Sequence, residues 1–237
     1  MFNFANQSIL IVGGSSGIGL ATAKLAASLG GEVTIASRTA DKVNAAKTSI
    51  GVNVAGRVID VTSDSNVEDF FSDDTTWDHV VVTGSQVKIA PVRELTLETA
   101  RASFDSKFWG FYRVARSAHI KPGGSLGVVA GVLATRPVAG RALMGAINGA
   151  LESLVQGLAL ELKPVRVNAV SPATIDTEMW SAMPKEARDA MFAKVCATYP
   201  AGCVGKPEDI ARQLLLFAGT RYATGTIVTL DGGASIA

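Results

Sequence analysis

Residues 8–24 read SILIVGGSSGIGLATAK, and this stretch is the most informative about the fold. An apolar, β-branched run at Ser8–Val12 leads directly into glycines and then into a helical pattern, which is typical of a dinucleotide-binding turn. Gly13 permits the tight turn, Gly17 lets a pyrophosphate approach the backbone, and Gly19 lets the helix pack against the strand. Free N–H groups at the start of the helix would then face negative charge. The stretch therefore predicts a nucleotide-binding β–α unit; the alternative is a tight turn that binds nothing.

Beyond this stretch, short β-branched runs alternate with longer helical patterns. The alternation predicts an α/β fold: a single doubly wound Rossmann-type domain whose seven-stranded, mostly parallel sheet carries helices on both faces. We expect strands at Ser8–Val12, Glu32–Ser37, Asn53–Asp60, His79–Thr83, Ser125–Ala130, Val165–Val170 and Thr226–Leu230. We expect helices at Ile18–Leu29, Ala40–Ile50, Asn66–Phe71, Leu97–Ala118, Ala142–Leu162 and Pro207–Phe217. No linker interrupts the pattern, so residues 1–237 are expected to form one domain.

Residues 176–202 break this rhythm. The segment is long and rich in Met and aromatic residues, and it contains Pro184 and Pro200. A segment of this kind late in an α/β domain often forms a lid or substrate loop. We therefore expect a small-molecule substrate or ligand beneath it; the alternative is a surface elaboration with two small helices.

The composition argues against several other classes of protein. The formal net charge is +1 without a basic block, which disfavours a nucleic-acid partner. Cys196 and Cys203 are expected to be reduced thiols, and two His residues make a zinc site very unlikely, so no metal is expected. Residues 1–7 do not resemble a signal peptide, and no apolar run reaches the roughly 18–20 residues of a membrane span. We therefore expect a cytoplasmic protein with no membrane partner.

The glycine spacing Gly-x-x-x-Gly-x-Gly resembles that of the short-chain dehydrogenase/reductase family, and later motifs support the resemblance. Asp60 matches the family's adenine-contacting Asp, and residues 82–85 (VTGS) stand where the family usually has Asn-Asn-Ala-Gly. Residues 165–172 (VRVNAVSP) are close to the family's sixth strand, and residues 231–233 (DGG) match the close of its last strand. Because order and spacing agree through nearly the whole chain, the protein is identified as a divergent member of this family.

The end of the second strand bears on the choice of cofactor. NAD-selective sites place an Asp or Glu there to accept the ribose hydroxyls. In this chain Ser37 occupies that position and Arg38 follows it. An Arg–phosphate contact contributes roughly 1.5–3 kcal/mol, and Ser16 could add a hydroxyl contact, so NADP(H) is favoured over NAD(H). The alternative is that Arg38 is an ordinary solvated charge.

The resemblance also implies a full set of cofactor-binding residues. They come from the glycine turn, the ends of the second, third and fourth strands, the long helix before the sixth strand, and the segment after that strand. The set comprises Gly13, Ser15, Ser16, Gly17, Ile18, Gly19, Ser37, Arg38, Asp60, Val61, Thr83, Gly84, Ser85, Asn148, Pro172, Ala173, Thr174, Ile175 and Thr177.

This chain departs from the family at all four catalytic positions that the resemblance implies. In the family a Tyr exchanges the proton, a Lys lowers the Tyr pKa and holds the nicotinamide ribose, a Ser binds the substrate oxygen, and an Asn supports a proton path. Here Met144 takes the Tyr position and Asn148 the Lys position. Gly131 takes the Ser position, and Lys107 takes the Asn position.

These substitutions remove the family's usual acid–base groups, but two of them exchange a Lys and an Asn between two positions. A thioether cannot donate a proton, and positioned acid–base catalysis typically contributes about 10²–10⁴-fold. At position 148, where the family has Lys, this chain has Asn, and at position 107, where the family has Asn, this chain has Lys. We hypothesise that Lys107 supplies an ammonium near the nicotinamide ribose or the substrate oxygen, with Asn148 as its hydrogen-bond partner. The alternative is drift, with Lys107 pointing to solvent.

Three functions remain open on the sequence. The favoured one is an atypical NADP(H)-dependent oxidoreductase that acts on a small hydrophobic carbonyl or alkene compound without the usual Tyr/Lys pair. The others are a catalytically silent NADP(H)-binding sensor and an inactive structural subunit of an active relative. Family relatives pack the helices at 97–118 and 142–162 against copies of themselves, which implies a homodimer or homotetramer. The substrate, the reaction direction and the choice between dimer and tetramer are not readable from the sequence.

Overall fold

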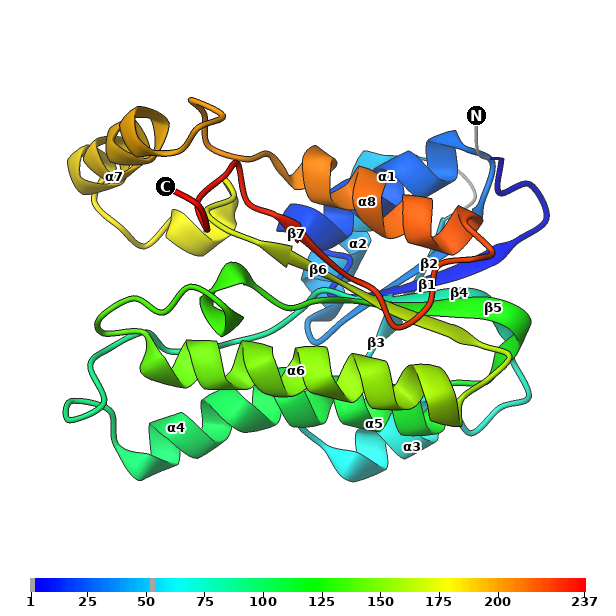
Figure 1. Ribbon diagram of the computed structural model, residues 1–237. Coiled ribbons are helices and arrows are strands. Elements are labelled where there is room, and N and C mark those ends of the chain that lie inside the picture. Colours follow the sequence, from blue (N-terminus) through cyan, green and yellow to red (C-terminus); the bar gives the residue numbers. More distant parts are fainter. Residues whose placement is uncertain (1–2, 52–53) are drawn as a thin grey trace.

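The computed structural model describes residues 3–51 and 54–237. Seven strands form one sheet in the order β3-β2-β1-β4-β5-β6-β7 (Figure 1), and all the recorded pairings are parallel. The strands are β1 (Ser8–Val12), β2 (Glu32–Ser37), β3 (Val54–Val58), β4 (Trp77–Val82), β5 (Ile120–Val129), β6 (Arg166–Pro172) and β7 (Ile227–Leu230). The predicted doubly wound α/β fold is confirmed.

Helices cover both faces of the sheet (Figure 1). One face carries α1 (Gly17–Ser28), α2 (Ala40–Ile50) and α8 (Pro207–Gly219). The other carries α3 (Asp64–Phe70), α4 (Leu97–Phe104), α5 (Gly110–Ser117) and α6 (Ala142–Glu161). The first layer and the second layer are therefore separated by the sheet, as parallel strands joined by crossover helices require.

The side chains of the central strands alternate between two cores. Leu10 and Val12 of β1 pack in the cluster beneath α5 and α6, together with Leu151 of α6. Ile9 and Ile11 of the same strand pack in the cluster beneath α1 and α8. Successive residues of a strand point to opposite faces, so a run that is buried on both sides must be apolar throughout.

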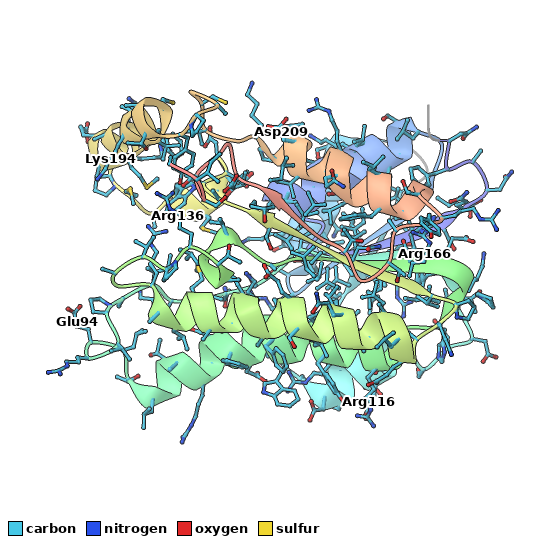
Figure 2. All side chains as sticks on the ribbon, in the orientation of Figure 1. Glu94, Arg116, Arg136, Arg166, Lys194 and Asp209 are labelled. Carbon is cyan, nitrogen blue, oxygen red and sulfur yellow. The ribbon has the colours of Figure 1, made fainter. Side chains whose placement is uncertain are left out.

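A buried guanidinium fixes the end of α8 to the sheet. Arg166 at the start of β6 donates hydrogen bonds to the backbone carbonyls of Phe217, Ala218 and Thr220 at distances of 2.5–2.8 Å. Arg166, labelled in Figure 2, is among the few charged residues of the described chain that are buried. Helix C-termini leave carbonyl oxygens without helical partners, and a cation there satisfies them. Arg166 therefore has a structural role.

The predicted helix at 97–118 is present as one helical run, but its middle is not α-helical, which the sequence analysis did not predict. Between α4 and α5 the chain forms a π-helical segment, η1 (Asp105–Trp109). A π-helical turn holds one more residue than an α-helical turn, so apolar periodicity alone does not reveal it. The strand predicted from Ser125 begins earlier, at Ile120, and Asn53, the predicted start of the third strand, lies outside the described residues.

The segment 176–202 contains regular structure. A short 3₁₀ helix, η3 (Glu178–Trp180), precedes α7 (Lys185–Thr198), and α7 lies beyond the carboxyl end of the sheet (Figure 1). Cys196 and Cys203 are both free thiols on exposed residues. The segment is thus a helical elaboration rather than an open loop.

By length and apolar composition alone, helix α6 could cross a membrane. Its buried residues include Ile147, Leu151 and Val155, which lie on the side that faces the sheet. A helix that covers the core of a globular protein can have the same length and composition, and we interpret α6 as such a helix.

Candidate functional site

In the glycine turn after β1, neighbouring backbone atoms leave no room for side chains. Gly13 has φ +86°, and a Cβ atom on it would lie 2.2 Å from the backbone nitrogen of Gly84. A Cβ atom on Gly19 would lie 2.2 Å from the carbonyl oxygen of Gly13. The hydroxyl of Thr83 donates to the Val12 and Gly13 carbonyls at 3.3 Å, which ties the turn to the end of β4. Only glycines fit here, and the start of α1 is left facing the edge of the sheet.

This turn lies where the strand order reverses. β1 pairs with β2 on one side and with β4 on the other, so the two connections diverge at the carboxyl ends of β1 and β4. Open α/β sheets bind ligands at this point, and helix N-termini there attract phosphate. Ser16, the N-cap of α1, makes no side-chain cap hydrogen bond and remains available to a ligand.

The end of β2 gathers hydroxyl and guanidinium groups. The Ser15 hydroxyl donates to that of Ser37 at 2.9 Å, and Arg38 Nη1 donates to Gln86 Oε1 at 2.9 Å. Gln86 is in turn held by the Ser106 hydroxyl, which accepts from its backbone N–H at 2.8 Å. Gln86 was not predicted as a site residue, because the loop after β4 has no sequence pattern that indicates a ligand contact. This group of residues suits a phosphate better than it suits a ribose diol.

Asp60 follows β3 and is locally ordered. Its carboxylate accepts from the backbone N–H and the hydroxyl of Thr62 at 3.0 and 2.7 Å. Partial burial raises the pKa of Asp60, but these hydrogen bonds and the charges of Arg38 and Arg113 outweigh it and hold the pKa below its usual value. The carboxylate is therefore a ready acceptor beside the predicted adenine position, and Val61 next to it packs against the core.

The segment after β6 returns to the glycine turn. A Cβ atom on Gly17 would lie 3.3 Å from the methyl group of Thr177, so these two residues face each other. Ile175 is buried and pairs with Gly205 in an isolated bridge, whereas the hydroxyl of Thr174 lies 3.4 Å from that of Tyr199. Pro172 ends β6, so Ala173 and the residues after it start from the carboxyl edge of the sheet.

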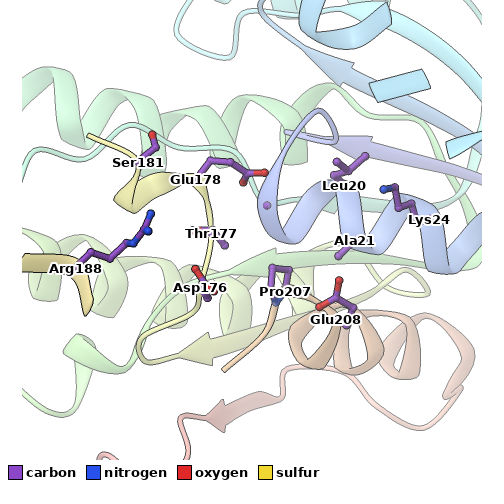
Figure 3. Close-up of a pocket in the computed structure, with 11 residues that line it drawn as sticks. Leu20, Ala21, Lys24, Asp176, Thr177, Glu178, Ser181, Arg188, Pro207 and Glu208 are labelled. Carbon is purple, nitrogen blue, oxygen red and sulfur yellow. The ribbon is translucent and has the colours of Figure 1, made fainter. Parts of the chain in front are cut away.

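A cavity of about 410 Å³ lies beside this segment (Figure 3). It touches the glycine turn at Gly17, but no residue of the predicted reaction centre lines it. Figure 3 shows Lys24 on the α1 side of the cavity and Arg188 on the α7 side. Its remaining lining is Leu20, Ala21, Asp176, Thr177, Glu178, Ser181, Pro207 and Glu208. The cavity is thus a neighbour of the cofactor turn and not the place where the chemistry would occur.

Lys107 and Asn148 meet at the predicted reaction centre. Lys107 lies in the π-helical segment η1, and Asn148 lies on α6. The Lys107 ammonium donates to Asn148 Oδ1 at 2.6 Å and to the Ala130 carbonyl at 2.8 Å. The side chain therefore points inward rather than to solvent. Met144 is half-buried one helical turn before Asn148, and its thioether supplies no proton donor.

The surroundings lower the pKa of Lys107 to about 8. Loss of hydration on burial is the main cause, and the negative charge of Glu152 opposes it. Glu152 lies one turn after Asn148 on α6 and accepts from the Ser171 hydroxyl at 2.5 Å. Sequence reasoning missed both residues, although the spacing of four along a helix places Glu152 on the face of Asn148.

Gly131 also belongs to the predicted reaction centre, and its lack of a side chain leaves space beside Asn148. It follows β5, and a Cβ atom on it would lie 2.6 Å from Asn148 Nδ2. Lys107, Gly131 and Asn148, which the resemblance aligns with the family's Asn, Ser and Lys, therefore lie side by side. Among the described residues no group of three or more His, Cys, Asp or Glu side chains could hold a metal ion.

Comparisons with known proteins identify the family and agree with the fold. Residues 12–235 match the family model described as enoyl-(acyl carrier protein) reductase. The short-chain dehydrogenase/reductase ATR9 of Stachybotrys chlorohalonatus is 35% identical over 247 residues, with 96% of each chain covered. A small-chain dehydrogenase solved in complex with NADPH is 31% identical, with a TM-score of 0.82 and coverage of 98% of this chain and 99% of that one.

Two more distant structures share the fold. The reductase/Diels-Alderase MalC of Malbranchea aurantiaca has a TM-score of 0.90 at 24% identity, over 97% of this chain and 96% of its own. An NADPH-bound short-chain oxidoreductase of Pseudomonas aeruginosa, described as containing an atypical catalytic centre, has a TM-score of 0.88 at 23% identity with full coverage of both chains. The family model and the first two relatives span nearly the whole sequence, and this chain belongs to the short-chain dehydrogenase/reductase family.

Proposed function

We propose that this chain is an NADP(H)-dependent reductase of a small hydrophobic carbonyl or alkene compound, and that Lys107 supplies the proton. The observation that carries the proposal is the Lys107 ammonium, which points inward and donates to Asn148 and to the Ala130 carbonyl. An ammonium has three N–H donors, so one remains for a substrate oxygen. A pKa of about 8 keeps this group charged at neutral pH and still able to release a proton.

The cofactor side of the proposal rests on residues that fit NADP(H). The glycine turn leaves no room for side chains, and Arg38, Ser15 and Ser37 gather at the end of β2 without a carboxylate. When bound, the nicotinamide would supply the hydride to the carbonyl carbon. Arg38 would exchange Gln86 for the 2′-phosphate, and Ser16 and the N-terminus of α1 would hold the pyrophosphate. The NADPH complex of the relative that is 31% identical supports this choice over NAD(H).

Lys107 then has a defined task. With the cofactor bound, its hydride would add to the carbonyl carbon, the π electron pair of the C=O bond would move to oxygen, and the Lys107 ammonium would donate a proton to that oxygen. The neutral amine regains its proton from water. Asn148 Oδ1 and the Ala130 carbonyl hold the ammonium in place during the transfer. Segment 176–202, with η3 and α7, is proposed to close over the bound substrate.

NADPH oxidation against a panel of aldehydes, ketones, quinones and enones tests the proposal. The Lys107→Met variant is expected to lose about 10²–10⁴ in kcat on any compound that the wild type reduces. Replacing the exposed Lys42 of α2 by Met is the matched control and should leave the rate unchanged. A Lys107→Met variant as fast as the wild type would contradict the role of Lys107.

The second candidate function is a silent NADP(H)-binding protein. The observation that favours it is Met144, because a thioether at the family's Tyr position offers no proton donor. Tight NADPH binding without turnover across the whole panel would favour this function over the reductase.

Self-association belongs to either function, and we propose a homodimer or homotetramer of a cytoplasmic protein. Leu97, Trp109, Tyr112 and Leu160 are large, exposed hydrophobic residues on α4, η1, α5 and α6. Leu160→Glu is expected to shift the protein to monomer in sedimentation, because a charge in such a contact is costly. Leu216→Glu on α8, at another exposed hydrophobic position, is the control.

A further inference from the structure

Gly131 and the side chain of Asn148 occupy adjoining space. A Cβ atom on Gly131 would lie 2.6 Å from Asn148 Nδ2 and 3.3 Å from its Cγ. Cβ atoms essentially never approach other atoms to less than 3.0 Å. The amide of Asn148 thus reaches into the volume beside residue 131 that any side chain there would need.

The orientation of this amide follows from its partner. The Lys107 ammonium can only donate, so the atom 2.6 Å from it must be the amide oxygen of Asn148. The nitrogen Nδ2 then faces Gly131. Lys107 therefore fixes which end of the amide points into the space beside Gly131.

The N–H groups of Asn148 Nδ2 have no recorded hydrogen-bond partner among the described residues. The Asn148 side chain belongs to a residue only 1% exposed, and its one recorded hydrogen bond among the described residues is the one through Oδ1. The only enclosed side-chain nitrogen or oxygen without a partner in that part of the chain is Arg166 Nε. Nδ2 is therefore not fully enclosed, although the residue as a whole is buried. An unpaired donor in a buried side chain is unfavourable until a ligand oxygen satisfies it.

We propose that Asn148 Nδ2 donates a hydrogen bond to the oxygen of the bound carbonyl compound, from the space that Gly131 leaves and beside the Lys107 ammonium. The proposal rests on the reductase function and adds a second donor to it. Asn148 would then be a catalytic residue that does the work of the family's Ser hydroxyl from another element of the fold. Gly131 is a positioning residue, because its lack of a side chain admits the amide.

The placement is tested first by stability, which needs no turnover. Gly131→Ala is expected to lower Tm by roughly 3–10 °C through overpacking against the amide. In an Asn148→Ala background the same change should lower Tm by less than about 2 °C, because the amide is gone. Gly149→Ala, beside Asn148 on α6 with nothing within 4 Å of its Cβ, is the control. An equal loss of Tm in both backgrounds would overturn the proposal.

The donor role is tested by Asn148→Asp. The carboxylate still accepts from Lys107 but has no N–H, so kcat on a panel carbonyl should fall about 10²–10³-fold. This fall should exceed any rise in the NADPH Kd at least about tenfold. A kcat within about threefold of the wild type would overturn the proposal.

A binding experiment separates this inference from the function on which it rests. If the wild type reduces no panel compound, the reductase function fails, and hexanamide serves as an unreactive carbonyl probe of the NADPH complex in calorimetry. Affinity at least about tenfold weaker in Asn148→Asp than in the wild type supports the amide as the donor. Equal affinity in both proteins, or binding to neither, overturns the inference.

Discussion

The cofactor side of this site and its reaction centre diverge from the family pattern in different ways. On the cofactor side, the spacing of the glycine turn and the position of Asp60 follow the family pattern. At the predicted reaction centre, the residues that the resemblance aligns with the family's catalytic positions, at 107, 131, 144 and 148, differ from the family pattern. Both regions lie at the same edge of one sheet, so the fold itself does not explain the difference.

The contacts suggest why the reaction centre could change while its scaffold did not. Lys107 donates to Asn148, and the Asn148 amide uses the space beside Gly131. Each of these three residues is therefore compatible with the other two in its size and hydrogen bonding. Independent decay would leave buried polar groups without partners, which is costly. The glycine turn has no such freedom, because backbone atoms surround it.

The largest effect that would sharpen this comparison is expected from Gly13→Ala. A Cβ atom there would lie 2.2 Å from Gly84 N, at a φ of +86° that side chains disfavour. NADPH affinity should fall more than about 100-fold, as measured by fluorescence titration, because the turn must open. Gly157→Ala on α6 is the control with open space. Near-normal NADPH binding by Gly13→Ala would show that the turn is not the cofactor site.

The next effect concerns cofactor choice. Arg38→Ala is expected to weaken NADPH about 10–100-fold while leaving NADH unchanged, because only NADPH carries the 2′-phosphate. Calorimetric titration of both nucleotides measures it, with the exposed Arg116→Ala as a control. Equal losses for the two nucleotides would assign Arg38 to the fold instead.

A third test uses pH to probe the reaction centre. The rate of reduction should fall roughly tenfold per pH unit above about pH 8, as Lys107 loses the proton that it donates. The free energy of unfolding should instead rise with pH over this range. The pKa of Lys107 is 10.5 in the unfolded reference and about 8 in the fold, so between these values the folded state binds fewer protons and its stability rises with pH.

The measurements for this test are kcat/KM against pH and urea unfolding at pH 8 and pH 10. A flat rate profile through this range would remove Lys107 as the acid. The Lys107→Met variant should lose the rise in stability.

The smallest effect is expected on the outer side of α6. A Cβ atom on Gly157 meets nothing within 4 Å, so Gly157→Ala should raise the free energy of unfolding by about 0.5–1 kcal/mol through the helix propensity alone. Urea unfolding measures this change. A loss of stability would mean that the space beside Gly157 is needed by another part of the assembly.

The fold was predictable because its signals are local. The apolar strands, the glycine turn and the first-turn Pro207 of α8 each mark an element by themselves, and the predicted elements are present with ends shifted by a few residues. The shape of segment 176–202 was not predictable, because helix α7 has only one buried residue, Val195, to impose a period.

The reaction centre could be anticipated only through the resemblance. Alignment placed Lys107 and Asn148 in the same cavity, and the structure shows them in contact. It could not reveal the amide beside Gly131, because that contact joins residues on different elements and depends on a missing side chain. Gln86 likewise acts through a tertiary contact that no spacing in the chain encodes. The spacing of four residues could have indicated Glu152 on the face of Asn148, but not its contact with Ser171.

The wide turn at Asp105–Trp109 has an evolutionary consequence. It holds the lysine on its inner side and Trp109 on the surface, in a segment that carries a surplus residue relative to an ordinary helix. Loss of one codon here would regularise the helix and keep Phe111 and Val114 in register with the core. The same loss within α5 would rotate those side chains by about 100° into solvent. New chemistry could thus be inserted or erased at this single point without the protein ceasing to fold.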